Sequence, residues 1–126
     1  MVARVTTPDV AGAVDEAARL AERLDVRLRY HDARHTFQEV VPAALDLADD
    51  HGLSRHDRAL VETAAAWHDL GFLETRSGYE AAAMSMVRER LPSYGYAPRD
   101  VETVAGMILA TRLPQWPRTV LGRILA

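Results

Sequence analysis

The stretch AAAWHDLGF, residues 64–72, decides the fold that we expect for this chain. It closes an apolar segment that Ser54 and Asp57 introduce with a capping pattern, in which the serine hydroxyl accepts a backbone N–H. Alanine is the best helix former, and a run of alanines beside a tryptophan leaves a helix apolar on most sides. We therefore predict a central helix that begins after Ser54 and is stopped by Gly71.

The end of this predicted helix also places a charge in apolar surroundings. His68 and Asp69 stand between Trp67 and Leu70. Moving an ionised carboxylate into such surroundings is unfavourable unless a cation or several hydrogen-bond donors meet it, and a metal ion is one such cation. On the residues alone, the alternative stays open that His68 and Asp69 only cap the end of the helix.

Outward from this stretch, the chain alternates helix signals with turn signals and has no segment in which apolar and polar residues alternate as in a strand. Besides the central helix we predict helices over 7–24, 33–51, 78–90, 98–109 and 118–126. Thr7 is expected to cap the first helix and Gly52 to follow the second in a left-handed conformation. Pro42 is expected to kink the second helix from inside. The predicted fold is all-α, a single domain over residues 1–126 that forms a bundle of about five to six helices.

The composition limits the partners of this domain. The 126 residues include 15 Lys and Arg against 18 Asp and Glu, a net charge of −3, which provides no basic field for a nucleic-acid duplex. No apolar run reaches the roughly 18 residues that span a bilayer, and the first residues lack a secretory pattern, so we expect no membrane partner and a cytoplasmic location. Cysteine is absent, so a metal site would use histidine and carboxylate ligands. A small soluble ligand is the expected partner.

Two histidines lie four residues apart in YHDARHT, residues 30–36. If this segment is helical, His31 and His35 share one face a turn apart and can act on one site. HDARH also differs by one carboxylate length from the H-E-x-x-H motif of zinc peptidases, with Asp32 in the place of the glutamate that acts as general base. We rank a zinc peptidase third among the interpretations, because aspartate is shorter than the glutamate of that motif and no strand is predicted to hold a peptide substrate.

Taken in order, these segments resemble the HD-domain metal-dependent phosphohydrolases. The matching residues are YHDARHT at 30–36, AAAWHDLGF at 64–72, Glu80 and MILATRLPQWP at 107–117, so the resemblance covers residues 30–126. It implies an HD-like helical bundle in which His35, His68 and Asp69 bind one divalent metal ion, which could be Mn, Zn, Fe, Ni or Mg. Members of that family take a later aspartate as fourth ligand, and this chain stops at Ala126 after an apolar Ile-Leu pair. We therefore expect either that the domain is truncated at its C-terminus, with that aspartate just beyond Ala126, or that the protein lacks this ligand.

The resemblance also implies roles for residues around the metal. Asp69 would orient the attacking water as well as bind the ion, and His31 would protonate the leaving oxygen, because an imidazole titrates near neutral pH. Glu80 would hold a histidine or a water beside the ligands. Three arginines would bind the substrate phosphate through their guanidinium groups: Arg34, Arg112 and Arg118. For the arginines and His31 the alternative is an ordinary surface residue, and for Glu80 it is a carboxylate stabilised by a helix N-terminus.

The function predicted from the sequence is hydrolysis of a phosphomonoester or phosphodiester, with a small phosphorylated molecule such as a nucleotide as substrate and a metal-activated water as nucleophile. The alternative is a catalytically degenerate HD module that binds a ligand or a partner without turnover. The sequence also permits a homodimer through apolar helix faces. An aspartate close after Ala126 would favour catalysis over the degenerate module.

Overall fold

The computed structural model describes residues 7–24, 34 and 36–111, and these form helices and the turns between them. The α-helices are α1 (Val10–Ala21), α3 (Val41–Asp50), α4 (Arg55–Trp67), α5 (Tyr79–Arg90) and α6 (Pro98–Ala110). Shorter helices join them: a π-helix, η1 (Thr36–Val40), and two 3-10 helices, η2 (Leu70–Leu73) and η3 (Leu91–Tyr94). The described residues contain no strand, which confirms the all-α prediction. The predicted helix over 118–126 lies outside the described residues.

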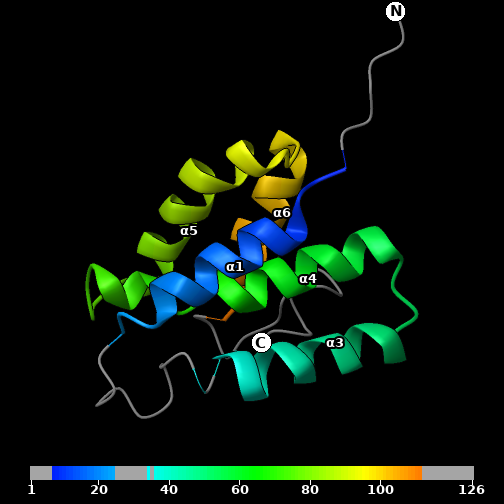
Figure 1. Ribbon diagram of the computed structural model, residues 1–126, viewed down its shortest axis with the longest axis horizontal. Coiled ribbons are helices and arrows are strands. Elements are labelled where there is room, and N and C mark those ends of the chain that lie inside the picture. Colours follow the sequence, from blue (N-terminus) through cyan, green and yellow to red (C-terminus); the bar gives the residue numbers. More distant parts are fainter. Residues whose placement is uncertain (1–6, 25–33, 35, 112–126) are drawn as a thin grey trace, which may run out of the picture.

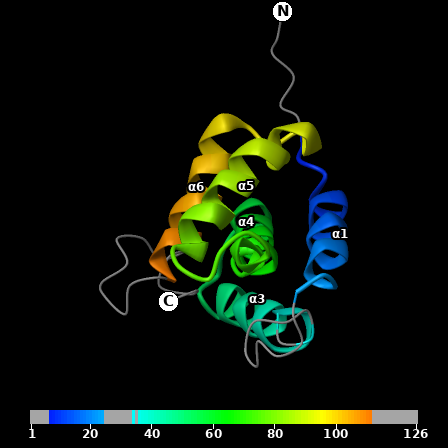
Figure 2. The ribbon, with the colours of Figure 1, turned by 90° about the vertical axis from the view of Figure 1, so that its left-hand side faces the viewer.

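α4 is the central helix, as its alanine-rich sequence predicts. Figure 2 shows it in the middle of the bundle, and α1, α3 and α6 pack against it, while α5 packs on α6 and η2. The buried side chains of α4 lie on several sides of the helix: Leu60, Val61, Thr63, Ala64, Ala65, Ala66 and Trp67. Small side chains let neighbouring helices approach closely, so the alanines allow α4 to have several helical neighbours at once.

The helices of the described part of the chain are short. The longest, α4 and α6, have 13 residues each, and none is long and apolar enough to cross a membrane.

α3 and α4 form an antiparallel helical hairpin (Figure 1). Gly52, just after α3, has a φ of 66°, as predicted for a left-handed residue at this position. Ser54 then caps α4, because its hydroxyl accepts the backbone N–H of Asp57 at 3.1 Å. An ion pair between Arg58 and Asp49, 2.8 Å apart, joins the two helices across the turn. The short connection brings η1 and the beginning of α3 beside the end of α4.

The start of α1 differs from the prediction. Asp9, not Thr7, is the N-cap, because its carboxylate accepts the N–H of Gly12 at 2.9 Å. The N–H of Asp9 itself donates to the carbonyl of Tyr94 at 2.7 Å, which fixes where the chain enters the helix. The prediction was wrong because this second bond joins residues far apart in the sequence.

Pro42 does not lie inside one continuous helix, as predicted, but in the first turn of α3. A proline is tolerated there because its missing N–H would have no partner in that turn. The π-helix η1 ends at Val40, directly before α3. In a regular α-helix a proline ring collides with a carbonyl group of the preceding turn. The change from π-helix to α-helix lies at the position where this collision would disturb a regular α-helix.

Gly71 does not stop α4, contrary to the prediction from the sequence. α4 ends at Trp67, and Gly71 lies in η2 without a positive φ. A Cβ added to Gly71 would overlap the carbonyl oxygen of Tyr79, at the beginning of α5. The glycine is therefore required for the close approach of η2 to α5 rather than for a turn.

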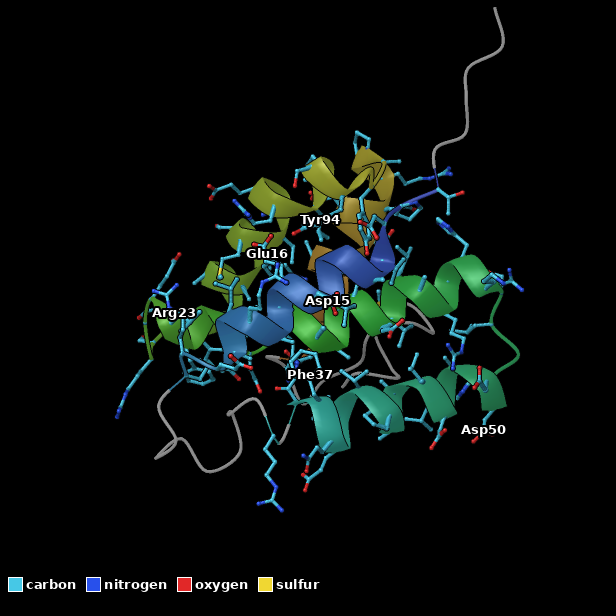
Figure 3. The ribbon with its side chains drawn as sticks, viewed as in Figure 1. Asp15, Glu16, Arg23, Phe37, Asp50 and Tyr94 are labelled. Atoms are coloured by element: carbon cyan, nitrogen blue, oxygen red, sulfur yellow. The ribbon has the colours of Figure 1, made fainter. Side chains whose placement is uncertain are left out.

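A buried carboxylate fastens α1 to the end of α5. Glu16 accepts two hydrogen bonds from Arg90, at 2.8 and 2.9 Å, and a third from the hydroxyl of Tyr94 in η3 (Figure 3). The hydrogen bond from Arg90 is the largest influence on the pKa of Glu16, and with Tyr94 it outweighs burial and lowers that pKa below its ordinary value of 4.5. The ionised form of Glu16 is thus the one that the fold stabilises.

Substitution Gly71→Ala tests the close approach of η2 and α5. We expect it to lower the free energy of unfolding by about 1–3 kcal/mol, because the added methyl group forces two packed segments apart. Gly106→Ala is the matched control, since nothing lies within 4 Å of a new Cβ at this position in α6. There, alanine should stabilise the helix by about 0.5–1 kcal/mol. Urea unfolding measures both changes, and equal effects of the two substitutions would contradict this role for Gly71.

Substitution Glu16→Gln tests the clip between α1 and α5. Because folding lowers the pKa of Glu16, its carboxylate stabilises the fold above pH 4.5, and this contribution is lost as the pH falls through the lowered pKa. The variant should lose about 1–2 kcal/mol of unfolding free energy near pH 7, and the difference should shrink near pH 3. Asp15→Asn, at an exposed neighbouring position (Figure 3), is the control. A loss of the same size at both pH values in urea unfolding would refute an ionic clip.

Candidate functional site

His68 and Asp69 lie at the buried end of α4, between Trp67 and η2. Their side chains are 13% and 3% exposed. Nδ1 of His68 lies 2.6 Å from the carbonyl oxygen of Ala65. Since a carbonyl oxygen only accepts hydrogen bonds, Nδ1 carries a proton, and Nε2 is the nitrogen that faces Asp69, with Oδ2 at 3.1 Å.

The surroundings of His68 act on its pKa in opposite directions. Burial lowers the pKa, because it disfavours the charged imidazolium. The hydrogen bond to Asp69, the charge of Asp69 and the Ala65 carbonyl together outweigh burial and raise the pKa of His68 above its ordinary value of 6.5. The pair therefore favours a proton on His68 beside the Asp69 carboxylate.

Trp67 fixes this end of α4 against α1. Its side chain is fully buried, and its indole N–H donates to the carbonyl of Ala13 at 3.1 Å. Truncating such a buried aromatic side chain typically costs about 3–5 kcal/mol, so the anchor is strong. His68 and Asp69 therefore directly follow a residue that cannot move without disrupting the packing of the core.

A second set of side chains reaches the pair from η2 and α5. Phe72 and Tyr79 stack with their ring centroids 3.9 Å apart and their planes 19° from parallel. Burial is the main cause that raises the pKa of Tyr79 to about 12, followed by the charge of Glu80, a hydrogen bond with Glu80 and the charge of Asp69. The Tyr79 phenol is thus within electrostatic reach of two carboxylates, and Glu80 is itself buried.

Thr36 contributes a buried polar atom near the same end of the bundle. It is the first residue of η1, and η1 packs against α4. The residue is 1% exposed, and its hydroxyl oxygen has no hydrogen-bond partner. A buried hydroxyl in this state is unfavourable, so it calls for a physical explanation.

The donor set at the end of α4 fits part of a metal site. Two donors that are each about 2.1 Å from one ion lie about 3.0–3.4 Å apart, which matches the 3.1 Å between Nε2 of His68 and Oδ2 of Asp69. The proton of Nδ1 on the Ala65 carbonyl is the second contact that metal-binding histidines usually make. Within residues 7–24, 34 and 36–111, no group of three histidine or acidic side chains is placed to hold an ion. The described residues thus supply the two donors of His68 and Asp69.

The remaining candidate residues are placed as follows. His31, His35, Arg112 and Arg118 lie outside the described residues, so their roles stay predictions. Arg34 is exposed and donates from Nε to the side chain of Gln38 at 3.3 Å. Glu80 is in the first turn of α5, buried, and coupled to the site through Tyr79. Of the three predicted ligands, the structure therefore places His68 and Asp69 together, and His35 lies outside the described residues.

Two further histidines, His51 and His56, are exposed. His51 bonds the carbonyl of Leu47 at 2.8 Å. His56 lies 3.0 Å from Asp100, a contact between the first turns of α4 and α6. Because His68 is at the other end of α4, Asp100 is too far along the bundle to take part in the site.

Tyr79 and Thr36 were not predicted from the sequence as site residues. The sequence signal for Tyr79 was its position directly before Glu80. For Thr36, the sequence offered only its position after His35, since the lack of a hydrogen-bond partner depends on tertiary packing.

Comparisons of the chain with models of known families, with curated proteins and with solved structures find no match. The family assignment therefore stays a prediction from the ordered motifs.

Substitution Asp69→Asn tests the coupling of the pair in protein treated with a chelator. We expect the pKa of His68 to fall from above 6.5 to below it, because burial then dominates. An NMR titration of the imidazole C–H resonances measures this shift, with His68→Ala assigning the signal. Asp50→Asn, at the other end of α3 (Figure 3), is the control and should leave the pKa of His68 unchanged. A His68 pKa that is the same with and without the Asp69 carboxylate would contradict the pairing.

Proposed function

We propose that this protein is a metal-dependent phosphohydrolase of the HD-domain type, acting on a small phosphorylated substrate. The observation that carries the proposal is the buried pair in which Nδ1 of His68 bonds the Ala65 carbonyl and Nε2 lies 3.1 Å from Asp69. A histidine held in this way by a backbone carbonyl is oriented for metal binding. The order of the motifs from 30–36 to 107–117 supports the same family.

In this proposal His68 and Asp69 hold one divalent ion together with His35. When bound, such an ion lowers the pKa of a water molecule and offsets negative charge on phosphoryl oxygens. Asp69 also orients the water through its carboxylate, and His31 gives a proton to the leaving oxygen. Burial of His68 and Asp69 excludes bulk solvent, which strengthens every electrostatic contact at the site.

The residues around the pair have supporting tasks. Glu80 accepts a hydrogen bond from Tyr79 and keeps that phenol beside Asp69. Arg34, Arg112 and Arg118 supply positive charge for the phosphate of the substrate, for which a nucleotide is the proposed class. Arg34 is exposed, and its guanidinium donates a hydrogen bond to the side chain of Gln38.

The test is manganese binding and hydrolysis by the full chain. Calorimetric titration with MnCl₂ measures binding, and release of nitrophenol from bis(p-nitrophenyl) phosphate measures diester cleavage. We expect binding of about one equivalent of Mn²⁺ and turnover that depends on the metal. His68→Ala should lose the turnover and at least about tenfold in metal affinity.

His51→Ala is the matched control, because this exposed imidazole at the end of α3 bonds the Leu47 carbonyl and is far from His68 along the helical hairpin. It should bind Mn²⁺ and hydrolyse the diester like the unsubstituted chain. Binding that His68→Ala abolishes, without turnover on any phosphoester tried, would favour the alternative of a degenerate module that binds without hydrolysis. Absence of metal binding in the unsubstituted chain would overturn the proposal.

A further inference from the structure

The hydroxyl of Thr36 is the buried side-chain polar atom of the described residues that has no hydrogen-bond partner. The residue is 1% exposed, so bulk water does not compensate for the missing bond. Nearly all buried polar groups in folded proteins are paired, and each exception calls for a physical explanation, such as a catalytic role or a bound water or ion. Thr36 is therefore the strongest sign of a ligand position in the described part of the chain.

Other helical threonines of the described residues satisfy their hydroxyls locally. Thr63 donates to the carbonyl of Ala59 at 2.8 Å, Thr103 to Arg99 at 3.0 Å, and Thr111 to Ile108 at 2.6 Å. Such bonds to the preceding turn are the normal arrangement for threonine in a helix. Thr36 opens a π-helix instead, and its hydroxyl makes no such bond.

The helical hairpin places Thr36 level with the candidate metal ligands. Thr36 stands 16 residues before Gly52, and Asp69 stands 16 residues after Leu53, on the two arms of one antiparallel hairpin. η1 and the end of α4 lie side by side in this arrangement (Figure 1). Thr36 also directly follows His35, the third predicted ligand, in the sequence.

We propose that the Thr36 hydroxyl hydrogen-bonds an oxygen atom of the ligand that binds at the His68–Asp69 pair. This inference rests on the proposed function. In one case the oxygen belongs to a phosphate anion, and the hydroxyl donates a hydrogen bond to it. In the other case the oxygen belongs to a water molecule bound to a divalent cation, and the hydroxyl accepts a hydrogen bond from that water or donates one to it. In both cases ligand binding supplies the partner that the hydroxyl lacks in the ligand-free fold.

Thr36→Val, which replaces the hydroxyl by a methyl group of similar size, separates stability from binding. Without a ligand the variant should be as stable as the unsubstituted protein or melt a few degrees higher, because an unpaired buried hydroxyl is removed. Thr63→Val is the matched control, since Thr63 is equally buried but its hydroxyl contacts both the Ala59 carbonyl and the Tyr96 hydroxyl. That variant should melt several degrees lower.

Binding is measured by calorimetry on the full chain, first with MnCl₂ alone and then with inorganic phosphate at saturating Mn²⁺. We expect Thr36→Val to weaken one of these affinities by about tenfold, and Thr36→Ser, which keeps the hydroxyl, to restore it. A loss in the MnCl₂ titration assigns the hydroxyl to the hydrated cation, and a loss confined to phosphate assigns it to the anion. Thr63→Val should keep both affinities at temperatures where it is folded.

Two negative results of these titrations have different meanings. If the unsubstituted chain binds neither Mn²⁺ nor phosphate, the proposed function fails and this inference fails with it. If the unsubstituted chain binds them and Thr36→Val binds both equally well, only the role of Thr36 is refuted. A lower melting temperature for ligand-free Thr36→Val would also count against the proposal, since it would reveal a partner for the hydroxyl within the fold.

Discussion

The burial of Trp67 is the constraint on which the rest of the structure depends. Its indole ring is enclosed in the core, and its N–H is bound to the backbone of α1 at Ala13, so the end of α4 and the middle of α1 cannot separate. α1 is in turn held to the end of α5 through Glu16 and Arg90. These contacts join segments far apart in the sequence around one central helix, and they leave His68 and Asp69 at its fixed end.

The parts of the fold that were predictable from the sequence are those set by local chemistry. Ser54 caps α4, and Gly52 adopts a positive φ, because each acts on backbone groups only a few residues away. The role of Gly71 was missed, since the reason for a glycine there is the carbonyl of Tyr79, which folding brings against it. The cap at Asp9 was missed for the same reason, since the bond from the N–H of Asp9 to the carbonyl of Tyr94 joins residues far apart in the sequence.

The candidate site divides in the same way. The motif HD at 68–69 was recognisable as polar chemistry in an apolar segment, and the structure adds that Ala65 selects the tautomer of His68. Tyr79 and Thr36 carry no motif, because what distinguishes them is the burial of a phenol beside carboxylates and of a hydroxyl without a partner. Properties of this kind belong to the packed protein, and residue type or spacing does not reveal them.

The π-helix η1 gives the chain one residue more than an α-helix of the same length would hold. Deleting a single residue from 37–40 would let that segment become a regular α-helix, and the residues on either side would keep about their present orientation, because the π-helix already accommodates the extra residue. A deletion within α3 would instead rotate Thr36 by about 100° around the helix axis relative to α4 and take it out of its buried position. The chain should therefore tolerate the loss of a residue in η1 better than the loss of a residue in α3, and insertions should be tolerated at the Gly52 turn.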